Sequence, residues 1–333
     1  MANESRSLFR RIGSWIDKYT PIDLEYYFRY YLRAAEWNRI RNDVRIDTQD
    51  LIEILDEITH EVEEPPKITA IRVGARNKPW KGNLYPLHEA GLLKLHTVEP
   101  DEDECERLSN LIDEDYRFHS KGLSDYEGEQ TLYLTEAGAT SSLYKPTTNH
   151  LEQFPWIHSH LNIRETVPVQ TTTLNQLCSE QNIAPDIILL DTQGSELDIL
   201  QGGDDLLDSV FMVQLEARTV PMYQNEPLLP VILDWMNKNS FRILDLDFQR
   251  WGADGFVNDV SRPGKRDFQL NAETIEVHSL FSNNSNITNK KESLRRIFIS
   301  ISLGKLTVAN RILDTMDDDP DLRKVRDILN EYT

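Results

Sequence analysis

The chain has 333 residues, of which 39% are hydrophobic, and a formal net charge of -20. This length suffices for one large domain with appendages or for two domains. The negative charge repels nucleic-acid phosphates, so DNA and RNA are not expected as substrates, and no apolar run is long enough to predict a transmembrane helix.

The N-terminal region, residues 1–64, is predicted to be helical. Residues 24–40 are rich in aromatic side chains and arginines, and residues 50–62 carry apolar side chains at helical spacing. This region can pack onto the rest of the chain, or bind a partner, a second copy or a membrane surface. The first residues lack the apolar core of a signal peptide, so we expect a cytoplasmic protein.

Between residues 68 and 281, short apolar runs alternate with helical stretches. Strands are predicted at residues 68–73, 94–98, 118–123, 131–135, 186–190, 210–215, 241–246 and 275–281. Helices are predicted at residues 174–179 and 228–237. This alternation is typical of an α/β protein with a doubly wound, Rossmann-like sheet, in which ligands bind beyond the carboxyl ends of the strands.

Three carboxylates come directly after predicted strands. Glu99, Asp191 and Glu216 each follow an apolar run. The carboxyl ends of parallel strands meet at one edge of a sheet, so this edge is expected to carry all three acids. A magnesium site built from them remains open.

The sequence gives little support for other metal sites or for disulfides. His158 and His160 are two residues apart and lack the spacing of helical zinc motifs, so no metal is predicted there. The cysteines are Cys105 and Cys178, and two are too few for a disulfide scaffold or a multi-cysteine zinc site.

The C-terminal region, residues 283–333, is predicted to be a helical extension. A polar break at residues 282–286 indicates a linker. Helices are predicted at residues 290–302 and 306–316, and Pro320 opens a last short helix. Their apolar faces indicate packing or contacts within a homo-oligomer. The predicted domains are therefore residues 1–64, 65–282 and 283–333.

The strongest local signal lies at residues 186–200. A buried strand runs into Asp191, then into a turn with Gly194, and a helix begins near Ser195. The amides of the new helix and the carboxylate at the strand end face one crevice, which is typical of a ligand site. An ordinary strand-to-helix turn with a capping acid explains the same residues, and the residues alone leave both interpretations open.

The segment D-T-Q-G-S-E at residues 191–196 resembles the D-x-Q-G-x-E motif of the FkbM-type methyltransferase family. The other segments that match this family, in the family's order, are Val98-Glu99-Pro100, Gly122-Leu123-Ser124-Asp125, Ser141-Ser142-Leu143, Val213 to Glu216 and Glu226-Pro227-Leu228. The resemblance covers residues 68–281.

This resemblance implies a class I methyltransferase sheet of seven strands, the last antiparallel, and S-adenosylmethionine as cofactor. Glu99 would hold the two ribose hydroxyls, Ser124 and Asp125 would lie near the adenine, and Asp191 would lie near the methionine end. The implied cofactor-binding residues are Gly74, Ala75, Arg76, Glu99, Ser124, Asp125, Asp191 and Gln193. The candidate catalytic residues are Asp191, Glu196 and Glu216, and no single base is named among them.

One segment departs from the family pattern. The first strand ends in Gly74-Ala75-Arg76, where the family has a loop with at least two closely spaced glycines. Arg76 can contact the methionine carboxylate or an anionic substrate, or it can pair with a nearby acid. This loop is the main support for a second hypothesis, a binding or assembly module that keeps the fold without catalysis.

The first hypothesis is an O-methyltransferase. Its acceptor would be a hydroxyl of a sugar, a glycan, a lipid-linked compound or a secondary metabolite, as the family resemblance suggests. A nicotinamide enzyme is disfavoured, because no G-x-G-x-x-G turn follows the first strand.

Overall fold

The computed structural model describes residues 48–74, 84–102, 105–106, 115–147, 155–252, 255–256, 273–283, 289–316 and 319–332. The chain divides into two compact units, Met1–Arg45 and Ile46–Thr333, and all the described residues belong to the second. The aromatic segment predicted to be helical at residues 24–40 therefore lies outside the described residues.

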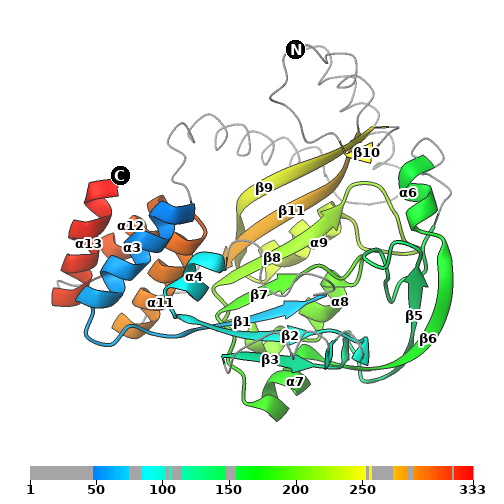
Figure 1. Cartoon of the computed structure of the whole chain (residues 1–333), viewed down its shortest axis with the longest axis horizontal. Coiled ribbons are helices and arrows are strands. Elements are labelled where there is room, and N and C mark those ends of the chain that lie inside the picture. Colours follow the sequence, from blue (N-terminus) through cyan, green and yellow to red (C-terminus); the bar gives the residue numbers. More distant parts are fainter. Residues whose placement is uncertain are drawn as a thin grey trace. The chain divides into compact units, whose positions relative to one another are not determined.

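The second unit is built on an eight-stranded sheet (Figure 1). Its strands are β1 (Ile68–Val73), β2 (Leu93–Val98), β3 (Tyr116–His119), β7 (Ile187–Leu190), β8 (Met212–Arg218), β9 (Phe241–Gly252), β10 (Gly255–Phe256) and β11 (Glu273–Asn283). Their order is β10-β9-β11-β8-β7-β1-β2-β3. The five strands from β3 to β8 are parallel, which confirms the predicted α/β class.

The antiparallel part of the sheet lies beside β8. The strand β11 pairs antiparallel with β8 on one side and with β9 on the other. The sheet has eight strands and not seven, because β9 runs on to Gly252 and the two-residue strand β10 pairs with its end.

The central strands form where the sequence is continuously apolar. The strand β7 reads I-I-L-L, and three of the four β8 residues paired with it, Met212, Val213 and Leu215, are apolar and buried. A strand covered on both faces needs apolar residues on both, which is why these segments show no alternation. The helices around this sheet are α4 (Tyr85–Glu89), α7 (Leu174–Gln181), α8 (Glu196–Gln201) and α9 (Leu229–Lys238), with a 3-10 turn at Asp204–Leu206.

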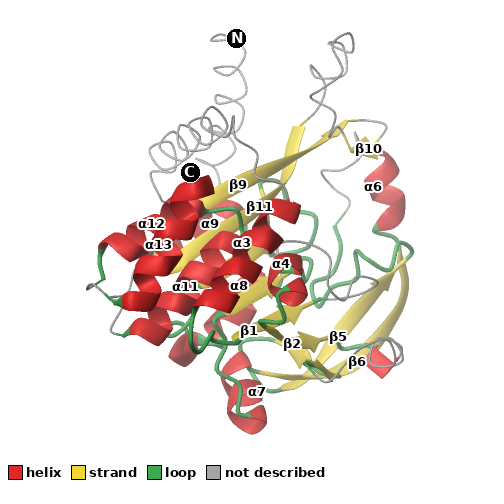
Figure 2. Ribbon diagram, turned by 60° about the vertical axis from the view of Figure 1, so that its left-hand side comes forward, coloured by secondary structure: helices red, strands yellow, loops and turns green. Residues whose placement is uncertain are grey.

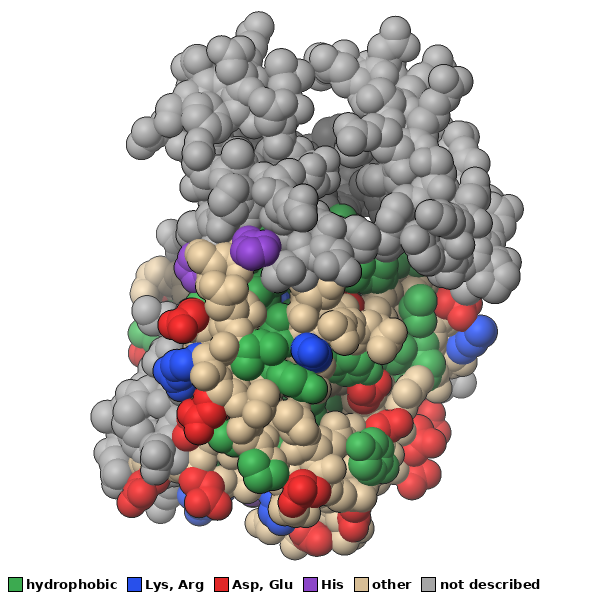
Figure 3. All heavy atoms as spheres, turned by 90° about the vertical axis from the view of Figure 1, so that its right-hand side faces the viewer, with side chains coloured by type: hydrophobic (Ala, Val, Ile, Leu, Met, Phe, Trp, Pro, Cys, Tyr) green, Lys and Arg blue, Asp and Glu red, His purple; other side chains and the backbone are tan. Residues whose placement is uncertain are grey.

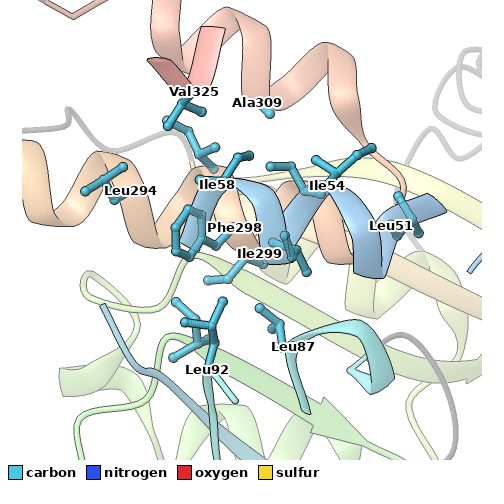
Figure 4. Close-up of a cluster of buried hydrophobic side chains, with 14 of the residues drawn as sticks. Leu51, Ile54, Ile58, Leu87, Leu92, Leu294, Phe298, Ile299, Ala309 and Val325 are labelled. Carbon is cyan, nitrogen blue, oxygen red and sulfur yellow. The ribbon is translucent and has the colours of Figure 1, made fainter. Parts of the chain in front are cut away.

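Four further helices form one cluster near the amino ends of the parallel strands (Figures 1 and 2). They are α3 (Thr48–Glu61), α11 (Lys290–Ser302), α12 (Leu306–Asp314) and α13 (Pro320–Tyr332). Figure 4 shows Ile58 of α3 and Phe298 of α11 packed together, with Leu87 and Leu92 approaching from the sheet side. A segment that precedes the strands and segments that follow them therefore share a hydrophobic core with the sheet. The last helix is 13 residues long, not short as predicted.

A second, three-stranded sheet has the order β4-β6-β5. Its strands are β4 (Gly122–Leu123), β5 (Gly128–Thr135) and β6 (Ile163–Thr172). The single strand predicted at residues 118–123 is wrong, because the chain leaves the large sheet after His119 and enters the small one at Gly122. Helix α6 (Pro155–His160) also forms, in a segment for which no helix was predicted.

Candidate functional site

The register of the parallel strands sets the geometry of the sheet edge. Val73 of β1 pairs with Val98 of β2 and with Leu190 of β7, and Leu190 pairs with Leu215 of β8. The residues that come next are Glu99, Gly74, Asp191 and Glu216, so these four occupy neighbouring positions in one row at the carboxyl end. Glu216 lies within β8 and not after it, because pairing with β11 extends β8 to Arg218.

Gly74 allows β1 and β7 to end close together. Its φ is +79°, in the left-handed region, and a Cβ built on it would lie 1.9 Å from the carbonyl oxygen of Asp191. Its amide donates to the carbonyl oxygen of Val98 at 3.1 Å. A residue with a side chain would push the two strand ends apart, so glycine is required here.

A cavity of about 180 Å³ opens at this edge of the sheet. Figure 3 views the molecule from the side toward which β1 points in Figure 1, where hydrophobic side chains gather among charged ones. The charged residues that line the cavity are Arg72, Glu99, Lys121 and Asp191. Its polar lining is Ser141, Ser142, Thr192, Gln193 and Ser195, and its apolar lining includes Pro100, Leu123, Leu132, Leu143 and Ile199. The cavity thus combines apolar walls with two cations and two carboxylates.

Glu99 is held in the wall of this cavity with 5% of its surface exposed. Its Oε1 accepts a hydrogen bond from the amide of Asp101 at 3.2 Å. A carboxylate has several acceptor sites and can take two hydroxyl donors at once. Glu99 therefore suits a ligand with two adjacent hydroxyl groups.

The turn after β7 is fixed by the carboxylate of Glu196. This carboxylate accepts from the amide of Thr192 at 2.8 Å and from the amide of Gly194 at 2.9 Å. Burial raises the pKa of Glu196, whose surface is 2% exposed, and the nearby Arg218 opposes that rise. Glu196 is not part of the cavity lining, so its role in the structure is to hold the turn.

Arg218 of β8 sits at the centre of a buried polar group beneath the turn. Its side chain is 1% exposed and forms ion pairs with Glu216 and, at 3.3 Å, with Glu226. It also donates to Oε1 of Gln193 at 2.9 Å. Burial raises the pKa of Glu226, and Arg218 opposes that rise. Buried charges need partners of opposite sign, and Arg218 is that partner for two carboxylates.

One wall of the cavity is tied to the same turn. Ser142 donates its hydroxyl hydrogen to the backbone oxygen of Gln193 at 2.7 Å, and Tyr144 donates to Oδ2 of Asp198 at 2.8 Å. Burial, with a further contribution from Asp198, raises the pKa of Tyr144. The amide of Thr147 donates to the oxygen of Met222 at 2.8 Å. Residues 138–147 are thereby fastened to the segments that carry Asp191 and Arg218.

The structure brings some of the predicted site residues together and separates others. Gly74, Glu99, Asp191 and Gln193 line the cavity. Four others do not line it: Ser124, Asp125, Glu196 and Glu216. Ser124 is buried and donates to Oδ1 of Asp125 at 3.1 Å. Ala75 and Arg76 lie outside the described residues.

Two cations of the cavity, Arg72 and Lys121, were missed by the sequence analysis. Arg72 places a charge in a mostly apolar strand, and that charge was the signal that the sequence offered. Burial lowers the pKa of Arg72, and the nearby Asp191 opposes that effect. In the register Arg72 faces Thr97 of β2, whose buried hydroxyl has no hydrogen-bond partner among the described residues.

No group of three His, Cys, Asp or Glu side chains within the described residues is arranged to hold a metal ion. In the same part of the chain, no helix is long and apolar enough to cross a membrane.

Comparison with known protein families gives one matching family model. The model of the FkbM methyltransferase domain matches residues 72–243, which is just over half of the chain. The chain belongs to the FkbM methyltransferase family. This membership confirms the resemblance seen in the sequence, and it makes S-adenosylmethionine the cofactor to test against the cavity.

Other known proteins are similar to this chain over part of its length. A 2-O-methyltransferase, NoeI, of Sinorhizobium fredii is 30% identical over 87 residues, which are 26% of this chain and 34% of that protein. The chain thus spans about a third of that relative. A putative methyltransferase of Thermoplasma acidophilum matches with 12% identity and a TM-score of 0.32, over 67% of this chain and 71% of that one. A magnesium protoporphyrin IX methyltransferase of Synechocystis matches with 8% identity and a TM-score of 0.31, over 80% and 99%.

Proposed function

We propose that the protein transfers a methyl group from S-adenosylmethionine to a hydroxyl oxygen. The observation that carries this proposal is the single row of Glu99, Gly74 and Asp191 along the wall of one cavity. The acceptor would be a hydroxyl of a sugar, a glycan, a lipid-linked compound or a secondary metabolite. The name of the similar 2-O-methyltransferase supports an oxygen acceptor. We further propose that all strands of the large sheet except β10 correspond to the seven-stranded methyltransferase sheet.

The residues of the cavity fit the cofactor. Glu99 is buried, so its position is set before a ligand arrives, and it would accept hydrogen bonds from both ribose hydroxyls. Gly74 has no side chain beside Asp191, so a ligand can approach the backbone at the strand ends closely. Arg72 would bind the methionine carboxylate, because a guanidinium matches a carboxylate with two parallel hydrogen bonds.

S-adenosylmethionine supplies, when bound, a methyl group on a positively charged sulfur. Asp191 would face the positively charged methionine end and receive or orient the acceptor hydroxyl. Glu196 and Glu216 are already engaged, with backbone amides in one case and with Arg218 in the other. Asp191 is therefore our candidate for the group that takes the hydroxyl proton. The wall at residues 138–143 would exclude water from the reacting atoms.

Calorimetry with S-adenosylmethionine and S-adenosylhomocysteine is the first test. We expect both to bind, and failure of both would reject the proposed function. Methyl transfer to a library of hydroxyl compounds is the second test. Turnover with a member of the library supports the enzyme, whereas binding without any turnover supports the alternative, a binding or assembly module.

A further inference from the structure

Gln193 lines the cavity in the position where a ligand-binding side chain is expected, yet its amide is fully engaged by the protein. Its Nε2 donates to Oδ1 of Asp191 at 3.0 Å and to Oε2 of Glu216 at 3.3 Å. Its Oε1 accepts from Arg218 at 2.9 Å and from the hydroxyl of Tyr223 at 3.0 Å. A glutamine side chain has two N–H donors and two acceptor positions, and all four are used here.

The orientation of this amide is determined by its neighbours. Ionised carboxylates only accept hydrogen bonds, so the side facing Asp191 and Glu216 must be the NH₂ group. A guanidinium only donates, so the side facing Arg218 must be the oxygen. The Tyr223 hydroxyl has a single hydrogen, which it shares between Gln193 and the carbonyl oxygen of Thr140, 2.8 Å away.

The backbone of Gln193 is held as firmly as its side chain. Its φ is +62°, a left-handed conformation that is uncommon for a residue with a side chain. Ser142 donates to its carbonyl oxygen at 2.7 Å. The residue as a whole is 8% exposed. A conformation of this kind persists only where the surroundings determine it, and here they direct the amide at Asp191.

We propose that Gln193 is a positioning residue, which holds the Asp191 carboxylate toward the cavity and does not itself bind the cofactor. This inference rests on the proposed function. One oxygen of Asp191 is bound by Gln193, and no hydrogen bond to its other oxygen occurs among the described residues. That second oxygen is the one left to meet a ligand. Arg218, Glu216 and Tyr223 all hydrogen-bond to Gln193, which in turn donates to Asp191.

A double-mutant cycle on the binding of S-adenosylmethionine tests this proposal. The variants are Gln193→Met, Asp191→Asn and the combination of both, each measured by calorimetry on the full chain. If Gln193 acts through Asp191, Gln193→Met weakens binding about 10-fold or more, the factor that corresponds to losing a hydrogen bond to a charged group. The same substitution then has almost no effect in the Asp191→Asn background.

Other results of the cycle overturn the proposal. An equal loss in both backgrounds would mean that Gln193 contacts the cofactor directly. No loss in either background would mean that the polar group beneath the turn has no part in binding. If the wild-type protein binds neither S-adenosylmethionine nor S-adenosylhomocysteine, the proposed function fails first and this inference falls with it.

Two further variants guard against a folding defect. Tyr223→Phe removes one donor to Gln193 but leaves the hydrogen bond from Gln193 to Asp191 in place. We therefore expect a smaller loss of affinity than for Gln193→Met. Gln176→Met makes the same chemical change on α7, where the side chain is exposed and donates to Glu180 at 2.8 Å, and should leave affinity unchanged. Thermal melts of all variants show whether each is folded at the temperature of the measurement.

Discussion

At the scale of single residues, Glu99 and Arg72 are proposed to bind opposite ends of the cofactor, the ribose and the methionine carboxylate. Glu99→Ala removes the acceptor proposed for the ribose hydroxyls. We expect the affinity for S-adenosylmethionine to fall by about 1.5–3 kcal/mol, the range for hydrogen bonds to a charged group. Calorimetry measures this loss directly. An unchanged dissociation constant would remove Glu99 from the cofactor site.

Arg72 is tested with two ligands that differ only at the methionine end. S-adenosylhomocysteine carries an amino acid group, whereas 5′-methylthioadenosine lacks it. We expect Arg72→Gln to weaken the binding of S-adenosylhomocysteine about 10-fold or more, through the loss of a charge-assisted hydrogen bond. The affinity for 5′-methylthioadenosine should stay unchanged. Lys121→Gln, which removes the other cation of the cavity, is the matched control. Equal losses for both ligands would show that Arg72 supports the cavity without recognising the carboxylate.

Some of this site could be predicted from the sequence because its residues follow strands. Glu99 and Asp191 come directly after apolar runs, so their place at the sheet edge follows from the chain direction alone. Arg218, Tyr223 and Gln193 could not be connected in that way. Their contacts join residues up to 30 positions apart through side chains, and no local pattern encodes such a group.

At the scale of the elements, the close approach of β1 and β7 depends on Gly74. Gly74→Ala would place its Cβ against the backbone of Asp191 and also force a left-handed φ. Gly91→Ala is the matched control, because Gly91 also has a positive φ, of +64°, but its Cβ would meet nothing within 4 Å. We expect the control to lose about 1–2 kcal/mol of unfolding free energy, the cost of the left-handed conformation.

Gly74→Ala should lose more stability than this control and should also lose cofactor binding. Chemical denaturation and calorimetry on the two proteins separate the effects. Equal stability losses, with binding retained in both, would mean that the strand ends tolerate a side chain at Gly74.

The contact between β2 and β3 predicts a dependence of stability on pH. His96 and His119 stack with their rings 5.4 Å apart, and one nitrogen of each lies 3.1 Å from the other. Burial, followed by the effects of His119, Lys94 and Arg117, lowers the pKa of His96 from 6.5 to about 4. Burial also lowers the pKa of His119. Between pH 6.5 and about pH 4, His96 therefore binds a proton in the unfolded chain but not in the folded one.

The unfolding free energy should therefore be unaffected by His96 above about pH 7 and fall as the pH drops toward 4. The loss from His96 is at most roughly 3.4 kcal/mol, since one pKa unit corresponds to 1.36 kcal/mol. His96→Gln should flatten the profile in this window, measured by urea denaturation at several pH values. His60→Gln is the control, because His60 is exposed and Asp56 raises its pKa, so that its removal should not flatten the profile as removal of His96 does. An unaltered profile in His96→Gln would show that the stacked pair does not cause the loss.

The elements themselves were predicted best where one physical rule decides them. The apolar run of β7 and the amphipathic faces of α11 and α12 fix their secondary structure locally. The strand β6 was missed, because most of its residues are exposed and Pro168 interrupts it. It forms by pairing with β5, and its own sequence carries no local pattern that predicts this pairing.

At the scale of the whole molecule, the hydrophobic core of the helical cluster and the proposed ligand cavity lie at opposite ends of the parallel strands. The helical cluster packs on Ile68, Leu92 and Leu93, where β1 and β2 begin, whereas the cavity lies where they end. Helices α11, α12 and α13 therefore complete a core that also contains residues of the sheet. A chain cut to residues 65–282 would expose that core surface, so we expect it to be unstable even though the cofactor row is intact.

This separation is best tested with a point substitution in the cluster. Phe298 is fully buried between α3 and the sheet side, and Phe298→Ala should lower the unfolding free energy by about 3–5 kcal/mol. Val231→Ala, which truncates an exposed side chain on α9, should cost far less. At temperatures well below the melting point of each variant, both should bind S-adenosylmethionine as the wild type does. A Phe298→Ala protein that is folded but binds more weakly would contradict the separation, since it would mean that packing at the amino ends of the strands controls the position of Glu99 and Asp191.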